Sequence, residues 1–600
     1  NYQMDKRVDI QLLRAIAVIY VVLFHLEIAG IESGFLGVDV FFVVSGFLMA
    51  ILYKEGDAKK FYERRAKRLI PAYFATVILT LLASIFIVLP SELGQVVTQS
   101  IYSLVFANNI GFWMQNSYFS KSDFNPLLHL WSLGVEIQFY LIVPLLVWFF
   151  RKSRAFLFLT LLGTFAACVF IVGISTKTSF FMMPLRMWEF LIGFIVAYYL
   201  TNNGNVKFEK YHWVGLLGLI TLCAIPFIHV DGQTLSRPQG HPSFIALGVC
   251  IATGLVLGFG IPKVLEDNPI SKFLAKIGDY SYSIYLVHFP IIVLYLYEPF
   301  SGTILYPKAY SDKAILLVLI IFASILMHKL VETRRIDKMV KVYWFSLFSL
   351  VLLTGAAKVA PSALYSQKEQ NIFNGLEDRA TYRCGKLSRI LDPKAISCKI
   401  NKEDFRNSVL LVGNSHADSI KMTFANVAGS HKFNTYFLVS NTPLMDNSVT
   451  PEMLVAEARK LKTDQIVLHF SPKAISKDVI ERVVLLAEKS KIDVKFILPV
   501  PIYNESVPKI LYENNLEAQY DVNKYLDNNH EIIADLESIK HKYKNFSTYE
   551  VHQVLCHPNC VISDAENHPY YFDDDHLNLT GANQLTSVFE KIFKERNNVN

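Results

Sequence analysis

The chain has 600 residues, a net charge of +6, 52% hydrophobic residues and a mean hydropathy of +0.31. This composition is too apolar for an ordinary soluble enzyme of this length. Lys and Arg form no polybasic block with interleaved aromatic residues, so we expect no nucleic-acid partner.

Apolar segments of spanning length dominate the first 360 residues. A helix needs about 20 apolar residues to cross the hydrocarbon core of a bilayer. The first segment follows MDKRVD directly and has no small-residue cleavage site, so we expect it to stay in the membrane. We predict a polytopic α-helical membrane bundle over 1–360, with eleven spans near 10–29, 35–53, 70–89, 130–150, 156–174, 183–200, 211–229, 243–260, 273–296, 313–331 and 342–360.

The loops between these segments alternate in charge. Loops such as 53–68 and 328–341 carry several Lys or Arg residues, whereas the intervening loops carry at most two each. Positively charged loops face the cytoplasm. We therefore expect a cytoplasmic N-terminus, and an odd number of spans then places residue 361 onward outside the cytoplasm.

Several ionisable residues lie inside predicted spans, where charge is costly and therefore points to function. Arg14 and His25 are eleven residues apart, which is about 20° past three helical turns and about 16 Å along the axis. Their side chains therefore share one helix face. Taken alone, they also fit a snorkelling arginine and a hydrogen-bonded core histidine. The other ionisable residues, which together predict a polar cavity within the bundle, are Asp39, Glu136, Arg186, Glu189 and His288.

The loop sequence ERRAKR places Arg65 and Arg68 three residues apart, hence on one face if the segment is helical. Guanidinium groups match phosphate oxygens well. The positive charge of cytoplasmic loops explains the same residues without any ligand. Both interpretations stay open on spacing alone.

Five motifs in order resemble the acyltransferase-3 family of integral membrane acyltransferases. They are Arg14-x10-His25, FLGVDVFFVVSGFL, Arg65-x-x-Arg68, HLWSLGVEIQFYLIVP and YSYSIYLVHFP, and they lie within about residues 8–335. The resemblance implies a bacterial inner-membrane enzyme that transfers an acyl group, usually acetyl, from cytoplasmic acyl-coenzyme A to a sugar hydroxyl outside.

The resemblance also implies roles for single residues. His25 is then a catalytic base or a transient acyl carrier, and Arg65 and Arg68 bind the phosphates of coenzyme A. Glu136 occupies the family's acidic position in VEIQFY, where the common form is VEEQFY and Ile137 here replaces the second glutamate. Acetyl-coenzyme A is thus expected as the acyl donor, with no permanently bound cofactor.

From about residue 361 the chain becomes polar, and we predict a periplasmic connecting segment over 361–405. Over 406–600 short apolar runs alternate with amphipathic stretches, which predicts a three-layer α/β sandwich with a mainly parallel sheet. The expected strands are 409–413, 465–470 and 494–502.

This second domain offers a serine, a histidine and an aspartate. Ser415 comes just after a predicted strand, where a strand-to-helix turn exposes a side chain at the sheet edge. Asp573 and His576 lie together in YYFDDDHLNLTGA. A Ser–His–Asp arrangement activates the hydroxyl for acyl transfer. Ser415 alone also fits a helix N-cap.

These blocks resemble the SGNH hydrolase-like domain often fused to acyltransferase-3 proteins, including O-acetyltransferases of bacterial O-antigens or peptidoglycan. The family's Gly-Asp-Ser block is here Gly413-Asn414-Ser415. For the oxyanion hole, Asn441 is the expected side-chain donor, and QIVLHFS contains no asparagine for the third block. The backbone N–H of Ser415 then carries more of the stabilisation.

The seven cysteines form two groups. Three lie in apolar runs and are predicted to be buried free thiols: Cys168, Cys223 and Cys250. The other four fit two disulfides in an oxidising compartment. A zinc site is the alternative, since His552 and His557 flank Cys556, but we predict disulfides and no metal. The disulfide candidates are Cys384, Cys398, Cys556 and Cys560.

The main prediction is an O-acyltransferase that passes acetyl through the bundle to Ser415 and then to a lipid-linked or surface polysaccharide. Lipopolysaccharide O-antigen or lipooligosaccharide is the favoured acceptor, and peptidoglycan is the alternative. A membrane-anchored glycan esterase does not explain Arg14, His25 and Glu136 within many spans. An acyl-group transporter commonly has two related halves, which this sequence lacks.

Overall fold

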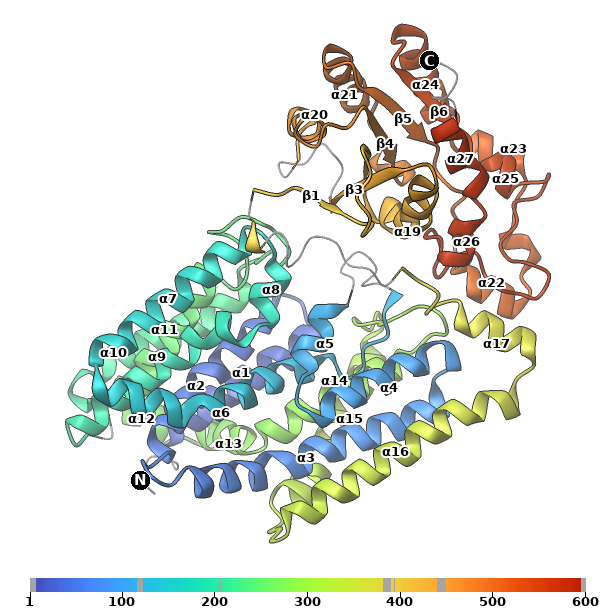
Figure 1. Cartoon of the computed structure of the whole chain (residues 1–600). Helices are drawn as coiled ribbons and strands as arrows, with labels where there is room; N and C mark the ends of the chain where they lie inside the picture. The colour runs from blue at the N-terminus through green and yellow to red at the C-terminus, as the bar shows by residue number, and fades with distance from the viewer. Residues whose placement is uncertain are drawn as a thin grey trace.

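The computed structural model describes residues 7–115, 122–205, 207–380, 390–392, 394–439 and 449–594. Figure 1 shows a helical bundle and, above it, an α/β domain built from the last third of the chain.

Among the described residues, nine helices are long and apolar enough to cross a membrane. Many of their large apolar side chains face outward, such as Phe86 at 82% exposure, as expected for helices that contact lipid. Both features identify a multi-pass membrane domain. The nine are α1 (Val8–His25), α2 with its leading turn (Gly34–Leu52), α3 (Ala58–Ile87), α6 (Leu128–Lys152), α7 (Arg154–Val172), α9 (Met183–Asn202), α10 with its flanking turns (Glu209–Phe227), α15 (Tyr310–Glu332) and α16 (Met339–Leu364).

Two of the eleven expected spans differ from single long helices. The span expected at 273–296 is a pair, α13 (Pro269–Asp279) and α14 (Ser281–Tyr295), bent by 66°. Exposed lysines on α13 favour the membrane surface over the bilayer core. The span expected at 243–260 is α11 (Phe244–Phe259), whose 16 residues reach only about 24 Å.

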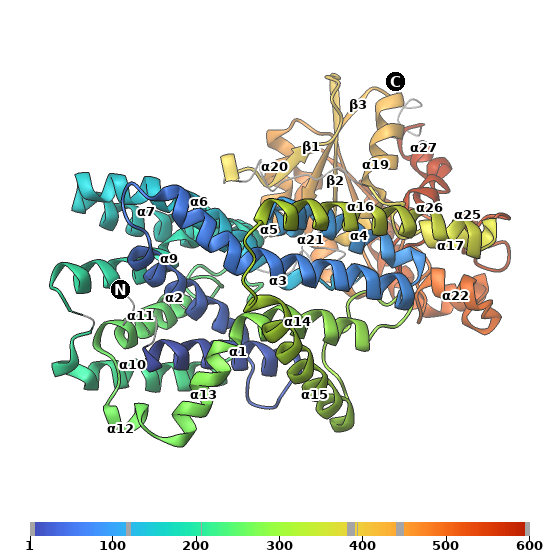
Figure 2. The ribbon, with the colours of Figure 1, turned by 90° about the horizontal axis from the view of Figure 1, so that it is seen from below.

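Shorter helices complete the bundle, and the last long helix leads out of it. Helix α16 packs along α3 and α4 (Figure 2) and carries the chain to α17 (Gln367–Asn374) beside the α/β domain. The remaining short helices are α4 (Pro90–Leu104), α5 (Asn108–Met114), α8 (Thr176–Phe181) and α12 (Lys263–Glu266).

The α/β domain contains a six-stranded sheet in the order β1-β3-β2-β4-β5-β6. Only β1 runs antiparallel to its neighbour, so the expected mainly parallel sheet is confirmed. The predicted strand 494–502 ends early because Pro499 and Pro501 cannot donate to a ladder. The strands are β1 (Ser397–Lys399), β2 (Asn407–Gly413), β3 (Phe433–Val439), β4 (Gln465–His469), β5 (Asp493–Ile497) and β6 (Phe546–Tyr549).

Helices cover both faces of this sheet and give the predicted three layers. On β2, Val409 and Leu411 face one apolar core, whereas Leu410 and Val412 face the other. The first core is covered by α19 (Ser415–Ser430), α22 (Val507–Glu513), α23 (Val522–Asn528), α25 (His552–Leu555), α26 (Leu579–Asn583) and α27 (Thr586–Lys594). The second is covered by α20 (Pro451–Lys460), α21 (Lys477–Lys489) and α24 (His530–Lys542).

The α/β domain contacts loops at one end of the bundle. Phe300, between α14 and α15, packs against Tyr512 of α22, and Ser122, before α6, hydrogen-bonds Asp573. Both loops are among those expected on the same side as the C-terminal domain. The relative sidedness inferred from loop charge therefore agrees with the structure.

Candidate active site

Ser415 begins α19 directly after β2, at the carboxyl edge of the sheet. The neighbours of β2 are β3 on one side and β4 on the other, so Ser415 lies where the strand order reverses. Gly413 is required there because an added Cβ would lie 1.9 Å from the carbonyl oxygen of His469. Asn414 caps α19 by accepting the backbone N–H of His416 at 3.1 Å, so Ser415 itself is not the N-cap.

The structure brings Ser415, His576 and Asp573 into one hydrogen-bonded chain. Nε2 of His576 lies 2.7 Å from Oγ of Ser415, and Nδ1 of His576 lies 2.7 Å from Oδ2 of Asp573. The backbone N–H of His576 donates to the other oxygen of Asp573 at 2.7 Å. This geometry matches a nucleophile, a base and an orienting acid.

A second carboxylate, which the sequence reasoning missed, reaches the same imidazole. Oδ1 of Asp575 lies 2.8 Å from Nδ1 of His576, and its Oδ2 accepts a hydrogen bond from Nε2 of the buried His416 at 3.1 Å. Burial opposes ionisation, yet these two histidines hold the pKa of Asp575 well below its usual range. The DDDH sequence contains the signal, because it supplies further acids beside Asp573.

The two carboxylates set the protonation of His576. Burial alone would lower its pKa, but the charges and hydrogen bonds of Asp573 and Asp575 outweigh burial and raise the pKa of His576 to about 10. The imidazolium donates to Ser415. Only the neutral ring, with its Nε2 lone pair, can accept the proton of that hydroxyl.

The oxyanion side of the site is partly described. Asn441 lies outside the described residues. Asn414 donates from Nδ2 to Oγ of Ser471 at 2.8 Å, and its Oδ1 accepts the backbone N–H of Ser471 at 3.3 Å. Ser471 follows β4, where the family resemblance calls for an asparagine. Its contact fixes the turn that carries Ser415.

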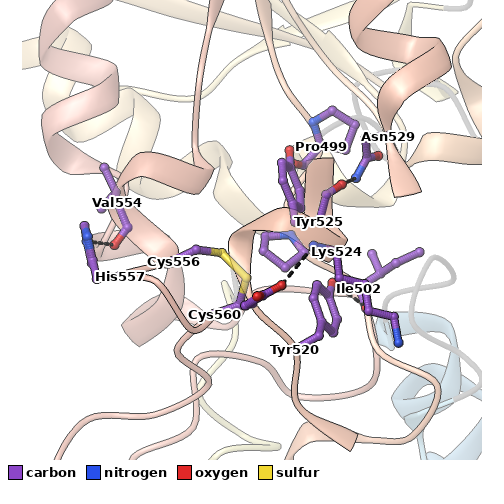
Figure 3. The surroundings of a disulfide bond; sticks show 12 residues. Pro499, Ile502, Tyr520, Lys524, Tyr525, Asn529, Val554, Cys556, His557 and Cys560 are labelled. Atoms are coloured by element: carbon purple, nitrogen blue, oxygen red, sulfur yellow. Dashed lines mark hydrogen bonds between the residues drawn. A yellow bond between two sulfur atoms is a disulfide. The ribbon is translucent and has the colours of Figure 1, made fainter. Parts of the chain in front are cut away.

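The polar cysteines form disulfides where the structure describes them. Cys556 and Cys560 are joined by a disulfide after α25, close to Tyr520 and Tyr525 (Figure 3). Cys398 in β1 is also disulfide-bonded, whereas Cys384 lies outside the described residues. The zinc alternative at Cys556 is therefore wrong, because the sulfur atoms of Cys556 and Cys560 are bonded to each other and cannot act as thiolate ligands.

The remaining cysteines are free thiols, as predicted. Cys168 and Cys250 are buried, but Cys223 is exposed on α10. The expectation of burial was wrong for Cys223, whose side chain stays exposed although it lies beside Tyr20 of α1.

Within the bundle, a cavity of about 80 Å³ collects four of the predicted site residues. Arg14 of α1, Arg65 and Arg68 of α3, and Glu136 of α6 all line it. Ser45 donates to Oε1 of Glu136 at 2.6 Å, and the Tyr140 hydroxyl donates to the same oxygen. Three guanidinium groups around one small polar cavity are suited to an anionic ligand.

His25 lies at the end of α1 and contacts His288 of α14. The two rings meet at 3.2 Å between Nδ1 of His25 and Nε2 of His288. Nδ1 of His288 lies 2.6 Å from the carbonyl oxygen of Tyr285, which itself lines the arginine cavity. Arg14 and His25 therefore both approach α14, which confirms that they share one face of α1.

The contacts of these two rings assign their tautomers. A carbonyl oxygen only accepts, so Nδ1 of His288 carries a proton and its Nε2 is the acceptor in the neutral ring. Nδ1 of His25 must then be the donor. The lone pair of His25 is left on Nε2, where it is available as a base or a nucleophile.

Three other residues expected in the cavity form a separate buried cluster. Nη1 of Arg186 lies 2.8 Å from Asp39 and 2.9 Å from Glu189, and all three side chains are at most 1% exposed. Helices α2 and α9 pack closely enough to allow this pairing, since a Cβ on Gly46 would lie 1.9 Å from the Phe190 carbonyl oxygen. The expectation of one shared cavity was wrong for these residues because both acids pair with Arg186.

Three groups bring potential metal-ligand atoms together among the described residues. The first is His416, Asp575 and His576, the second is Asp39, Glu189 and Cys250, and the third is the acidic run Asp573, Asp574 and Asp575. In the first group the ligand atoms already hydrogen-bond each other, and in the second the carboxylates pair with Arg186. Hydrogen bonds and ion pairs thus account for these two groups, and in the third Asp573 and Asp575 already contact His576.

Comparisons with known proteins agree with this architecture. The family described as "Acyltransferase domain" matches residues 7–327, and that described as "SGNH domain (fused to AT3 domains)" matches residues 383–591. O-acetyltransferase OatA of Staphylococcus aureus (strain NCTC 8325 / PS 47) is 33% identical over 306 residues, which cover 47% of this chain and 50% of OatA. The chain thus spans about half the length of this relative.

A longer match extends further along the chain. A protein of Staphylococcus aureus (strain MRSA252), provisionally named O-acetyltransferase SAR0937, is 28% identical over 447 residues, covering 67% of this chain and 72% of its own. No solved structure matches the chain. With a family match over more than half of its residues, the chain belongs to the acyltransferase-3 family and carries an SGNH domain fused to the membrane domain.

Proposed function

We propose that the protein is an O-acetyltransferase that moves acetyl from acetyl-coenzyme A at the cytoplasmic face of a bacterial inner membrane to a glycan hydroxyl outside. The observation that carries this proposal is the hydrogen-bonded chain Ser415–His576–Asp573 in a protein whose bundle holds a cavity lined by arginines. The first can form an acyl ester, and the second can bind an anionic donor. The names of the relatives support acetyl as the transferred group.

In the membrane step, Arg65 and Arg68 bind phosphates of coenzyme A while Arg14 and Glu136 line the same cavity. His25 acts as the base through Nε2, because its Nδ1 is engaged with His288. Nε2 removes a proton from the group that accepts the acetyl, and this group then attacks the thioester carbon as the nucleophile. The carbon–sulfur bond breaks, and the proton passes to the departing thiolate.

In the second step, His576 takes the proton of Ser415, and Oγ attacks the acyl carbon to form a serine ester. The bond between the acyl carbon and the nucleophile of the membrane step breaks, and the proton on His576 passes to that nucleophile as it leaves. A glycan hydroxyl next loses its proton to His576 and attacks the ester, which releases Ser415 as a hydroxyl again. Asp573 keeps the imidazole oriented through both halves of this cycle.

The acceptor follows from the side on which Ser415 lies. With the C-terminal domain outside the cytoplasm, its glycan partners are lipid-linked or surface polysaccharides. Lipopolysaccharide O-antigen or lipooligosaccharide and peptidoglycan all present hydroxyls there. Comparing the acetyl content of each fraction between cells with and without the protein identifies the acceptor.

The test uses His25→Ala and Ser415→Ala in the full chain, with the acetyl content of both glycan fractions measured by mass spectrometry. Each variant is expected to abolish glycan acetylation. His212→Ala and Ser430→Ala are matched controls, because both residues are exposed and lie outside the two sites. Wild-type acetylation in both His25→Ala and Ser415→Ala would refute the proposal.

A second measurement separates transfer from simple hydrolysis. Proteoliposomes carrying the full chain receive labelled acetyl-coenzyme A on one side and a glycan acceptor on the other. Label on the glycan supports transfer. Label recovered only as free acetate supports the esterase alternative and contradicts the proposal.

A further inference from the structure

The membrane domain reaches into the triad of the SGNH domain. Ser122, in the loop before α6, donates from Oγ to Oδ2 of Asp573 at 3.0 Å, across 451 positions of sequence. This is the same carboxylate oxygen that lies 2.7 Å from Nδ1 of His576. A side chain of the bundle therefore shares the acceptor atom that orients the triad histidine.

A second connection reaches the same histidine by another route. Asp123, next to Ser122, accepts from Nη2 of Arg379 at 3.1 Å, and Asp123 is only 3% exposed. The guanidinium of Arg379 lies 5.1 Å from the ring centre of Phe572. Phe572 stacks on His576 with an angle of 7° between the two rings.

Each side of this contact is held by its own domain. In the bundle, Gln95 donates to Oδ1 of Asp123 at 3.2 Å, and Thr303 donates to its backbone carbonyl at 2.6 Å. Beside the triad, Asp378 accepts the backbone N–H of Thr580 at 3.1 Å and thereby anchors the segment that carries Arg379. The contact thus joins two anchored segments.

We infer that the membrane domain completes the active site of the SGNH domain: Ser122 positions Asp573, and the Asp123–Arg379 ion pair holds the SGNH domain docked on the bundle. The triad reaches full activity only in this docked arrangement. Acyl transfer to Ser415 is thereby coupled to the position of the domain over the membrane. This inference rests on the proposed function for its biological role, although the contact itself is testable without glycan transfer.

The first test measures hydrolysis of p-nitrophenyl acetate by the full chain in detergent, with the Ser415→Ala rate subtracted. Ser122→Ala is expected to lower kcat about tenfold with little change in KM, because a hydrogen bond to a charged group is lost. Without this hydrogen bond, the negative charge of Asp573 favours protonated His576 more strongly. The pH at which the rate rises is therefore expected to be higher in Ser122→Ala. Ser122→Thr keeps the hydroxyl and is expected to retain activity.

Ser301→Ala is the matched control, since Ser301 lies in another loop at the same end of the bundle and its hydroxyl donates to the Pro299 carbonyl, away from the triad. It should leave both kcat and the pH profile unchanged. A Ser122→Ala variant with wild-type kcat and an unmoved pH profile would overturn the role of Ser122. Because this assay needs no glycan, its result is independent of whether the chain acetylates one.

The second test reverses the ion pair. Asp123→Arg and Arg379→Asp are each expected to lower acetyl transfer about tenfold or more, because each places like charges together in a buried contact. The double variant restores opposite charges and should recover most of the lost rate. If the double variant is no better than the single ones, the pair does not hold the docked arrangement.

Discussion

Asp575 places Oδ1 2.8 Å from Nδ1 of His576, so this ring nitrogen has two carboxylates within reach instead of the single acid of a minimal triad. Asp575 is itself tied to His416 at 3.1 Å. Burial works against a charged imidazole, but the two acids prevail and raise the pKa of His576 to about 10. Below that pH the ring is protonated and cannot accept the proton of Ser415, so serine chemistry should accelerate as the pH rises.

Replacing Asp575 with asparagine removes one of these charges. Since a nearby carboxylate favours the protonated ring, its loss should lower the pKa of His576 by about one to three units. In the pH profile of Ser415-dependent ester hydrolysis, the range over which the rate rises then moves to lower pH by a similar amount. The measurement is the rate between pH 5 and pH 10 for the full chain.

Asp574→Asn is the control, because Asp574 is exposed and no hydrogen bond to His576 is described for its side chain. Asp574→Asn should shift the pH at which the hydrolysis rate rises by less than Asp575→Asn does. An unchanged pH profile in Asp575→Asn would mean that Asp573 alone sets the protonation of His576.

His288 should act on His25 by accepting a hydrogen bond. His288→Leu removes the acceptor, so Nδ1 of His25 loses its partner and the proton can move to Nε2. We expect acetyl transfer to fall about 100-fold, which is the lower end of the usual contribution of a positioned base. In His288→Gln the side-chain oxygen can accept from Nδ1, so this variant should recover much of the rate.

The comparison of the two His288 variants separates positioning from packing. Both remove the ring and leave a buried space, so a purely structural role predicts equal losses. Equal rates for His288→Leu and His288→Gln would therefore contradict the tautomer assignment. The amount of folded protein, measured by size-exclusion chromatography, must match for both.

Variants of the arginines that line the cavity are expected to bind acetyl-coenzyme A more weakly. Arg65→Gln and Arg68→Gln should each raise KM for acetyl-coenzyme A about tenfold, since each removes a charge-assisted contact to phosphate. Arg64→Gln is the matched control on the same helix, because Arg64 is exposed and does not line the cavity. A rise in KM for Arg64→Gln equal to that of the other two would indicate a general charge effect instead of a site.

The features that the sequence predicts well are those set by local geometry. Eleven-residue spacing fixes Arg14 and His25 on one helix face whatever surrounds them. The serine after β2 and the Asp-x-x-His loop are also local patterns, although only the fold brings them within 2.7 Å. By contrast, the pairing of Asp39 with Arg186 depends on a helix contact 147 residues apart, which no spacing rule reveals.

The elements that the sequence did not predict were missed for equally specific reasons. In strand β3, Phe433 is followed by the buried polar residues Asn434 and Thr435, and Asn434 donates a hydrogen bond to the Phe405 carbonyl. Strand β1 has only three residues, which is too short for any periodicity. No proline marks the bend between α13 and α14, because the residue that follows the first helix is Tyr280. Tertiary contacts decide all three.

The Cys556–Cys560 disulfide should stabilise the SGNH domain modestly. The two cysteines are four residues apart, and closing so short a loop in the unfolded chain accounts for about 2 kcal/mol of unfolding free energy in the chain-entropy account. Cys556→Ser with Cys560→Ser should therefore lower the midpoint of the SGNH thermal transition, measured by calorimetry on the full chain. Cys223→Ser, at an exposed free thiol, should leave it unchanged. If the double serine variant melts at the wild-type temperature, the disulfide does not stabilise the fold.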